Sequence, residues 1–200
     1  MAIQDGRWAP GIGDPTVMGW VTVAIYFAVA LLCTWAAIRT SANKDNTVQG
    51  QDKALSFFWF SLSVLLILLG INKQFDLQSL LTQVGKDLAI AQGWYEKRRT
   101  VQFLFIIFIA ASGVGVLALL VRKYWAMLDY IKITLIGCVI LFIFILIRAM
   151  SFHHVDIFIH TKLAGIKMNW LFEIGGLSVI WIGALNYLRR IKTRSISKHS

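Results

Sequence analysis

The sequence predicts an all-α fold: a polytopic membrane protein with five transmembrane helices and one amphipathic interfacial helix on the outer side. Three observations support this prediction. The chain of 200 residues is 58% hydrophobic and only 15% charged, and its mean hydropathy is +0.67. Five apolar runs are each long enough to cross about 30 Å of hydrocarbon as a helix. Eight Trp and five Tyr suit a chain that meets the membrane interfaces repeatedly.

The whole chain, 1–200, is expected to form a single membrane-embedded domain, because no soluble segment separates the apolar runs. Each run is bounded by charged or turn-forming residues. In the fourth run, Lys132 and Arg148 stand at the two ends, where their side chains can reach the head groups. The expected parts are an outer tail (1–16), crossings at Val17–Ile38, Ala54–Ile71, Val101–Val121, Ile131–Met150 and Trp170–Leu188, an outer loop (72–100) and a basic cytoplasmic tail (189–200).

The distribution of basic residues predicts the orientation of the chain. The tail 189–200 carries five Lys/Arg and no acid, and Arg39–Lys53 and Arg122–Lys132 carry three Lys/Arg each. With five crossings, these three segments fall on one side, which the positive-inside bias makes cytoplasmic. The other side holds nine Lys/Arg together with seven of the ten acids. We therefore expect the N-terminus outside and the C-terminus inside, in a bacterial inner membrane.

The loop after the second crossing contains a helical pattern of its own. Its apolar residues recur on one face of a helix, whereas Gln78, Thr82, Lys86 and Asp87 lie away from that face. This pattern predicts a helix in the outer interface that ends near Gly93. An ordinary loop helix packed on protein is the alternative. The predicted apolar face consists of Leu77, Leu80, Leu81, Val84 and Leu88.

Small residues recur at helical spacing in two of the crossings. Ala111, Gly115 and Ala118 lie on one face of the third, and Gly176 and Gly183 lie in the fifth. Such residues predict close helix packing. Cys33 and Cys138 both lie inside apolar runs, so we expect free thiols rather than a disulfide.

Polar residues gather at the predicted outer ends of four helices, which is the strongest functional signal in the chain. Because these ends meet at one depth, they predict a site at the outer interface, with Arg, Lys and Asn binding a ligand and His, Asp and Glu doing acid–base or metal chemistry. The expected ligand-binding residues are Lys73, Asp76, Arg98, Arg99, Arg148 and Asn169. The expected catalytic residues are His153, His154, Asp156 and Glu173. Ordinary charge at helix ends is the alternative explanation.

The stretch Ser151–His160 holds three of the chain's four histidines. If the fourth helix continues, His153, Asp156 and His160 share one face; in an extended segment His154 replaces His153. Two His and one carboxylate suit zinc or non-haem iron. The predicted metal ligands are His153, His154, Asp156 and His160. Interfacial hydrogen-bonding histidines and acid–base catalysis without a metal remain alternatives.

Several activities are disfavoured by the sequence. Apart from the fourth crossing, no crossing carries a His, which argues against a haem held by two histidines from facing helices. No ionisable residue lies near the middle of a crossing and no repeat is visible, which argues against a transporter, proton pump or voltage sensor. The net charge is +10, but the basic residues lie between the apolar runs. They therefore indicate contact with membrane lipids and not with nucleic acid.

Two functional hypotheses follow from the sequence. The first is an enzyme or binding protein whose outer site takes a lipid-borne or small anionic ligand, with or without a metal ion. The second is a non-catalytic subunit or assembly factor of a larger membrane complex. The short chain and the absence of a recognisable catalytic motif favour the second hypothesis, whereas the polar outer layer favours the first.

Overall fold

The computed structural model describes residues 3–4, 7–8, 16–42, 49–75, 77–149, 162–163 and 166–197. Nearly all of them are helical. The helices are α1 (Val17–Ser41), α2 (Gln49–Phe75), α3 (Leu77–Ala91), α4 (Arg98–Lys123), α5 (Leu128–Ala149) and α7 (Met168–Ser197), with 3-10 turns η1 (Tyr95–Lys97) and η2 (Trp125–Met127). Two antiparallel ladders pair β1 (Ile3–Gln4) with β2 (Arg7–Trp8), and β3 (Lys162–Leu163) with β4 (Ile166–Lys167).

Five of the described helices are long and apolar enough to cross a membrane: α1, α2, α4, α5 and α7. They correspond in order to the five predicted crossings, so the all-α class and the multi-pass membrane character are confirmed. Most helices run beyond the predicted limits, because charged end residues such as Arg39 and Lys73 continue the helix.

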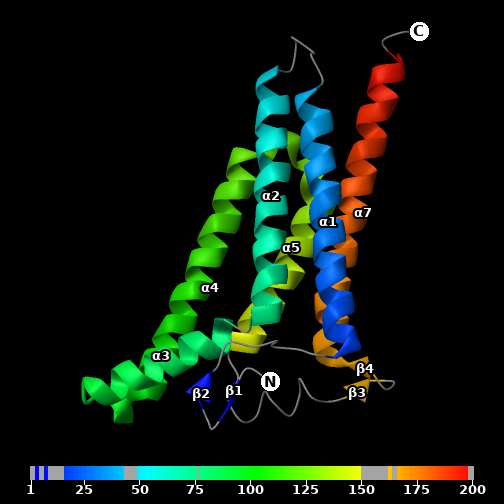
Figure 1. Ribbon diagram of the computed structural model, residues 1–200. Coiled ribbons are helices and arrows are strands. Elements are labelled where there is room, and N and C mark those ends of the chain that lie inside the picture. The colour runs from blue at the N-terminus through cyan, green and yellow to red at the C-terminus, as the bar shows by residue number, and fades with distance from the viewer. Residues whose placement is uncertain are drawn as a thin grey trace.

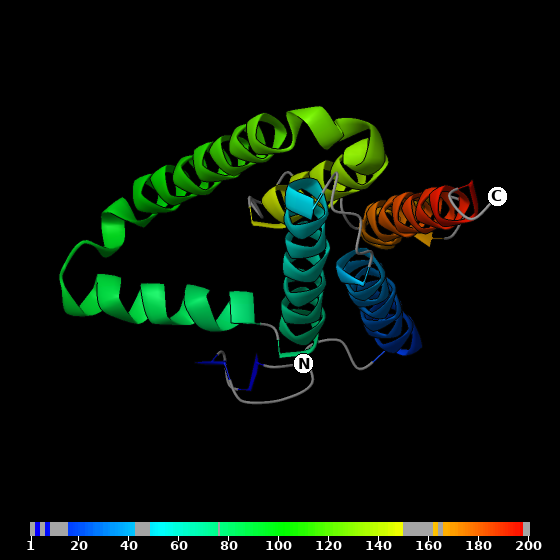
Figure 2. The same ribbon diagram turned by 90° about the horizontal axis from the view of Figure 1, so that it is seen from above.

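The five long helices run alternately up and down, so α1 begins and α7 ends at opposite ends of the bundle (Figure 1). We call these the α7-start end and the α7-finish end. The helix α1 packs against both α2 and α7, and α5 packs against α7. Viewed along the bundle, α4 stands apart from α1 and α7, while α3 extends sideways at the α7-start end (Figures 1 and 2).

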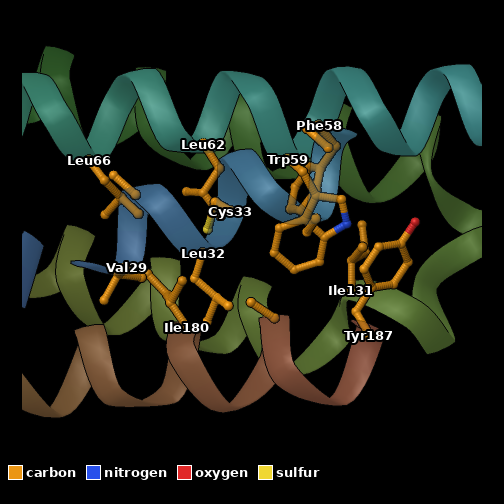
Figure 3. Packing of buried hydrophobic residues seen from close by; sticks show 14 of the residues in the cluster. Val29, Leu32, Cys33, Phe58, Trp59, Leu62, Leu66, Ile131, Ile180 and Tyr187 are labelled. Carbon is orange, nitrogen blue, oxygen red and sulfur yellow. The ribbon is translucent and has the colours of Figure 1, made fainter. Parts of the chain in front are cut away.

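The core lies between α1, α2, α5 and α7 and is apolar and aromatic. Figure 3 shows Val29 beside Ile180 at one part of the core, with Trp59 beside Tyr187 at the other. The rings of Trp59 and Tyr187 lie 4.9 Å apart between centroids. Both cysteines are free, as expected, and Cys33 belongs to this core.

Hydroxyl groups add polar links between α1 and α2. The hydroxyl of Ser63 donates to the Ala30 carbonyl at 2.9 Å and lies 2.7 Å from the Thr34 hydroxyl. One end of α2 is linked to the α4–α5 turn, where the Tyr124 hydroxyl donates to the Ala54 carbonyl at 3.1 Å. Burial raises the pKa of the Tyr124 hydroxyl, which keeps it a donor. Such bonds align helices where hydrophobic driving force is small.

Glycines bring α5 and α7 into close contact. A Cβ on Gly183 would lie 2.8 Å from the backbone nitrogen of Thr134, and one on Gly176 would lie 2.8 Å from Leu141 Cγ. On α5, a Cβ on Gly137 would lie 2.8 Å from the Ile180 nitrogen. The predicted close packing at Gly176 and Gly183 is therefore confirmed. The backbones of α5 and α7 can come this close because glycine has no side chain at these positions.

The small residues of α4 behave differently from those of α7. Ala111, Gly115 and Ala118 are all exposed, and a Cβ on Gly115 would meet nothing within 4 Å. The expectation that this face packs closely is wrong for the described part of the chain. Instead α4 meets α5 through Gly113, whose Cβ would collide with the Phe142 ring. The Phe142 ring therefore packs on the Gly113 side of α4, and the face with Ala111, Gly115 and Ala118 points away from the other helices.

The helix α3 spans the segment in which the periodic pattern predicted a helix. It ends in a Schellman motif: Gly93, at φ 72°, donates to the Ile90 carbonyl and Trp94 donates to the Ala89 carbonyl. Gly adopts this left-handed conformation without a Cβ penalty. On α3, Val84 and Leu88 are exposed together with Lys86, whereas Ala89 is buried.

Candidate functional site

A buried ion pair joins α2 to α7 at the α7-start end of the bundle. The Lys73 ammonium donates to Oε2 of Glu173 at 2.6 Å. Lys73 is 5% exposed and Glu173 only 2% exposed. Lys73 lies in the last turn of α2, and Glu173 lies about 8 Å along α7 from its first residue. Two opposite charges are therefore enclosed just inside one end of a membrane bundle.

A third helix contributes to the same group. The hydroxyl of Tyr26 on α1 donates to Oε1 of Glu173 at 3.2 Å, and Tyr26 is almost fully buried. Both oxygens of Glu173 are thus hydrogen-bonded, one by a cation and one by a neutral donor. We call Tyr26, Lys73 and Glu173 the charged triad. It joins α1, α2 and α7. Moving any one of these helices away would break a charge-assisted hydrogen bond to Glu173.

Tyr26 was not identified from the sequence as a site residue. Its hydroxyl is the single polar side-chain group between Val23 and Cys33 in the first crossing. A tyrosine buried in a membrane helix needs a hydrogen-bond partner, so its presence in that run was the available signal. Which partner it had could not be read from spacing, because α1 and α7 are 147 residues apart at this contact.

Gln74 lies next to Lys73 and has unused hydrogen-bonding capacity. Both its amide nitrogen and its amide oxygen are buried and have no partner among the residues that the structure describes. An unpaired buried amide is costly, because it has lost water without gaining another bond. Within the described part of the chain, one donor group and one acceptor of Gln74 are therefore unpaired at the α7-start end.

The structure brings together two of the predicted site residues, Lys73 and Glu173. Four more occupy helix ends: Arg98 and Arg99 begin α4, Arg148 is next to last in α5, and Asn169 is second in α7. All these ends lie at the α7-start end (Figure 1), while the side chains of these four are outside the described residues. The remaining predicted residues also lie outside the described residues: Asp76, His153, His154, Asp156 and His160.

Metal ligands were predicted only in the segment that contains the histidines. Among the residues that the structure describes, no group of three or more His, Cys, Asp or Glu side chains could hold a metal ion. Glu173, the described carboxylate nearest to that prediction, has both oxygens engaged by Lys73 and Tyr26. The predicted metal ligands His153, His154, Asp156 and His160 lie outside the described residues, so the metal site stays a prediction.

A second polar cluster lies at the other end of the core, and it carries no charge. The hydroxyls of Thr40 on α1 and Tyr187 on α7 lie 2.7 Å apart. Thr40 also donates to the Ala36 carbonyl at 2.6 Å. The Trp59 ring lies beside the Tyr187 ring, with the two ring planes tilted by 36° (Figure 3). Thr40, Trp59 and Tyr187 form what we call the neutral cluster.

Comparison with known proteins identifies no relative. No protein-family model, curated protein or solved structure matches the chain. The functional argument therefore rests on the geometry of the charged triad and its surroundings.

Proposed function

We propose that this membrane protein binds a lipid-borne or small anionic ligand at the α7-start end of the bundle, in a site centred on the charged triad. The observation that supports this proposal is the burial of Lys73 and Glu173 as a pair, 2.6 Å apart. Ionisable side chains within membrane helices are costly, and they mark binding or transport sites by default.

Stability alone is a weak reason for such a pair. Moving two charges out of water costs several kcal/mol per ion, and their attraction often does no better than offset that cost. Apolar residues of similar volume in place of such a pair often leave stability nearly unchanged. The pair is better explained by a task that needs a cation and a proton-accepting carboxylate enclosed together.

The arrangement suggests how an anion is bound. A phosphate or carboxylate can take the place of Glu173 beside the Lys73 ammonium, because both present the same kind of charged oxygen. The free Gln74 amide and the Tyr26 hydroxyl then supply further donors. The displaced Glu173 carboxylate would turn to another cation. Arg98, Arg99, Arg148 and Asn169 would form the outer part of this site, with Asp76 orienting them.

We propose that the predicted histidines belong to the same site. His153, His154 and Asp156 would bind a zinc or iron ion with His160, or would move protons together with Glu173. A metal assay on gently purified protein separates the two versions. Stoichiometric zinc or iron in wild type, lost in His154→Ala at matched expression, supports the metal version. A folded wild type without metal leaves only proton transfer or hydrogen bonding.

Binding is tested with two named probes, inorganic phosphate and dioctanoyl phosphatidic acid, by calorimetry on the purified chain in neutral detergent. Lys73→Gln/Glu173→Gln removes both charges while keeping a hydrogen-bonding pair, so the fold should be retained. We expect wild type to bind one or both probes and the double variant to bind at least about tenfold more weakly, as for loss of a charge-assisted bond.

Lys86→Gln is the matched control, because Lys86 is an exposed lysine on α3 near the same end. It should bind like wild type. Equal affinity in all three proteins would show that the probes bind outside the charged triad, and would refute the proposal.

The proposed membrane and orientation are a bacterial inner membrane with the α7-start end outside. Reporter fusions after Lys123 and Arg190 should report cytoplasm, and one near Lys86 should report the outer side. In this orientation α3 lies in the outer interface, with exposed Val84 and Leu88 toward lipid and Lys86 toward water. A cytoplasmic signal at Lys86 would reverse the side on which the ligand is met.

A second candidate function, a non-catalytic subunit of a larger membrane complex, is favoured by α4. No residue in the most apolar part of α4 is buried within the chain, and its face of small residues is open. A partner helix would fit there closely. Gly115→Leu should then break co-purification with a partner while leaving the charged triad intact. If the chain purifies alone from native membranes in mild detergent, the subunit function is ruled out.

A further inference from the structure

A groove lies between α1 and α2 at the α7-finish end, far from the charged triad. It occurs where α1 ends and α2 begins (Figure 1). Its volume is about 420 Å³, and it opens widely to the surroundings. The residues that line it are Ala37, Ile38, Ser41, Lys53, Ser56, Phe57 and Phe60.

The groove changes from polar to apolar along its length. Lys53 and Ser41 lie toward the helix ends, and Phe60 lies about 10 Å deeper along α2. On α2 the lining residues recur at positions 53, 56, 57 and 60, which places them on a single helical face. In a membrane-spanning α2, this order would place Lys53 toward the head groups and Phe60 toward the acyl chains.

The floor and walls of the groove suit a chain-like apolar ligand. Ala37 is buried at the floor, where its small side chain leaves space between the two helices. The hydroxyl of Ser56 donates to the Ala37 carbonyl at 3.0 Å, which holds α1 and α2 in register beneath the groove. Phe57 and Phe60 form the wall and remain 61% and 56% exposed.

The rim of the groove is positively charged. Lys53 is exposed and forms no ion pair with any residue that the structure describes. Lys123, at the end of α4, places its ammonium 5.2 Å from the centre of the Phe57 ring, which brings a second cation to the wall. Asp52, next to Lys53 in the chain, does not line the groove. The complementary ligand therefore carries negative charge at its head.

We infer that this groove binds one anionic glycerophospholipid from the leaflet at the α7-finish end. The phosphate lies against Lys53 and the Ser41 hydroxyl, and one acyl chain lies along Ala37, Phe57 and Phe60. Lys53 matches the phosphate of such a lipid, and the apolar channel matches its acyl chain. A soluble anion would make no contact with the aromatic wall.

The lipid is tested by thermal unfolding of the full chain in neutral detergent. Phosphatidylglycerol should raise the melting temperature more than phosphatidylcholine with the same acyl chains, because only the former carries net negative charge. In Lys53→Gln the same rise should need about fivefold more phosphatidylglycerol, the effect of one lysine near an anionic head group. Equal stabilisation by both lipids, or an unchanged response in Lys53→Gln, would overturn the inference.

Two controls separate this groove from other basic surfaces. Lys192→Gln removes an exposed lysine of α7 near the same end that does not line the groove, so it should respond like wild type. Soluble glycerol phosphate should give no rise; a rise equal to that with the lipid would show that the groove takes a soluble anion instead.

A measurement on wild type makes the inference independent of any variant. Phosphatidylglycerol with a photoreactive group in its acyl chain should label the apolar lining residues Ala37 and Ile38 of α1 and Phe57 and Phe60 of α2. Labelling restricted to α4 or α7 would show that lipid binds elsewhere and would remove the groove as a specific site.

Discussion

The two ends of the bundle solve the same packing problem with different chemistry. Tyr26 meets Glu173 at one end and Thr40 meets Tyr187 at the other, and both contacts join residues 147 apart on α1 and α7. They lie 14 residues apart on each helix, about 21 Å. One end uses a neutral hydroxyl pair beside Trp59, whereas the other encloses a full ion pair.

The difference shows what holding helices together requires and what it does not. The neutral cluster joins α1 to α7 without burying a charged group. The charged triad joins the same helices at the price of desolvating a lysine and a carboxylate. Since the cheaper solution is present in the same molecule, the charged one is better assigned to ligand chemistry than to stability.

The largest expected effect comes from breaking the ion pair on one side only. Lys73→Met leaves Glu173 buried without its cation, which should lower the free energy of unfolding by about 3–5 kcal/mol. Lys73→Met/Glu173→Leu should recover most of that loss, because no uncompensated charge remains. Unfolding by denaturant in bicelles measures both. A loss below about 1 kcal/mol in the single variant would mean that water reaches the pair.

A smaller effect is expected from the tyrosine of the charged triad. Tyr26→Phe removes the 3.2 Å donor to a charged oxygen of Glu173, and such bonds contribute about 1.5–3 kcal/mol. The same unfolding assay should show this loss in wild type but little of it in the Lys73→Met/Glu173→Leu background. An equal loss in both backgrounds would assign the effect to packing of the ring.

The seam between α5 and α7 keeps the two ends in register, and a methyl group tests it. Gly183→Ala places a Cβ 2.8 Å from the Thr134 nitrogen, and such overpacking should cost about 1–3 kcal/mol. Gly115→Ala on α4 is the matched control, because its Cβ meets nothing within 4 Å. It should be neutral or stabilise by up to about 1 kcal/mol through helix propensity. Similar losses in both would show that α4 is packed as closely as α7.

The smallest effect is expected at the neutral cluster. Tyr187→Phe removes the 2.7 Å contact with Thr40, but the Thr40 hydroxyl keeps its bond to the Ala36 carbonyl. Interhelical hydrogen bonds of this kind in membranes contribute about 0.6 kcal/mol on average. Comparing Tyr187→Phe with Tyr26→Phe in one unfolding series measures the difference between the two ends directly. A larger loss for Tyr187→Phe would invert that comparison.

The sequence by itself determined the all-α class, the five helices that are long and apolar enough to cross a membrane, and the helix at Leu77–Ala91. These depend on the length and period of apolar runs, on charge at their ends and on one glycine in a left-handed turn, all of which are local properties. It also singled out Lys73 and Glu173, because a shared depth can be read from position along a crossing.

The tertiary structure alone decided which residues at one depth meet. Spacing along a helix gives the direction of a side chain relative to its own helix, but not which helix stands opposite. For that reason the sequence could not predict three features: the bond of Tyr26 to Glu173, the contact of Trp59 with Tyr187, and the groove above Ala37. The outward face of α4 has the same cause: small residues permit a close neighbour, and only the packing of the other helices decides whether one is there.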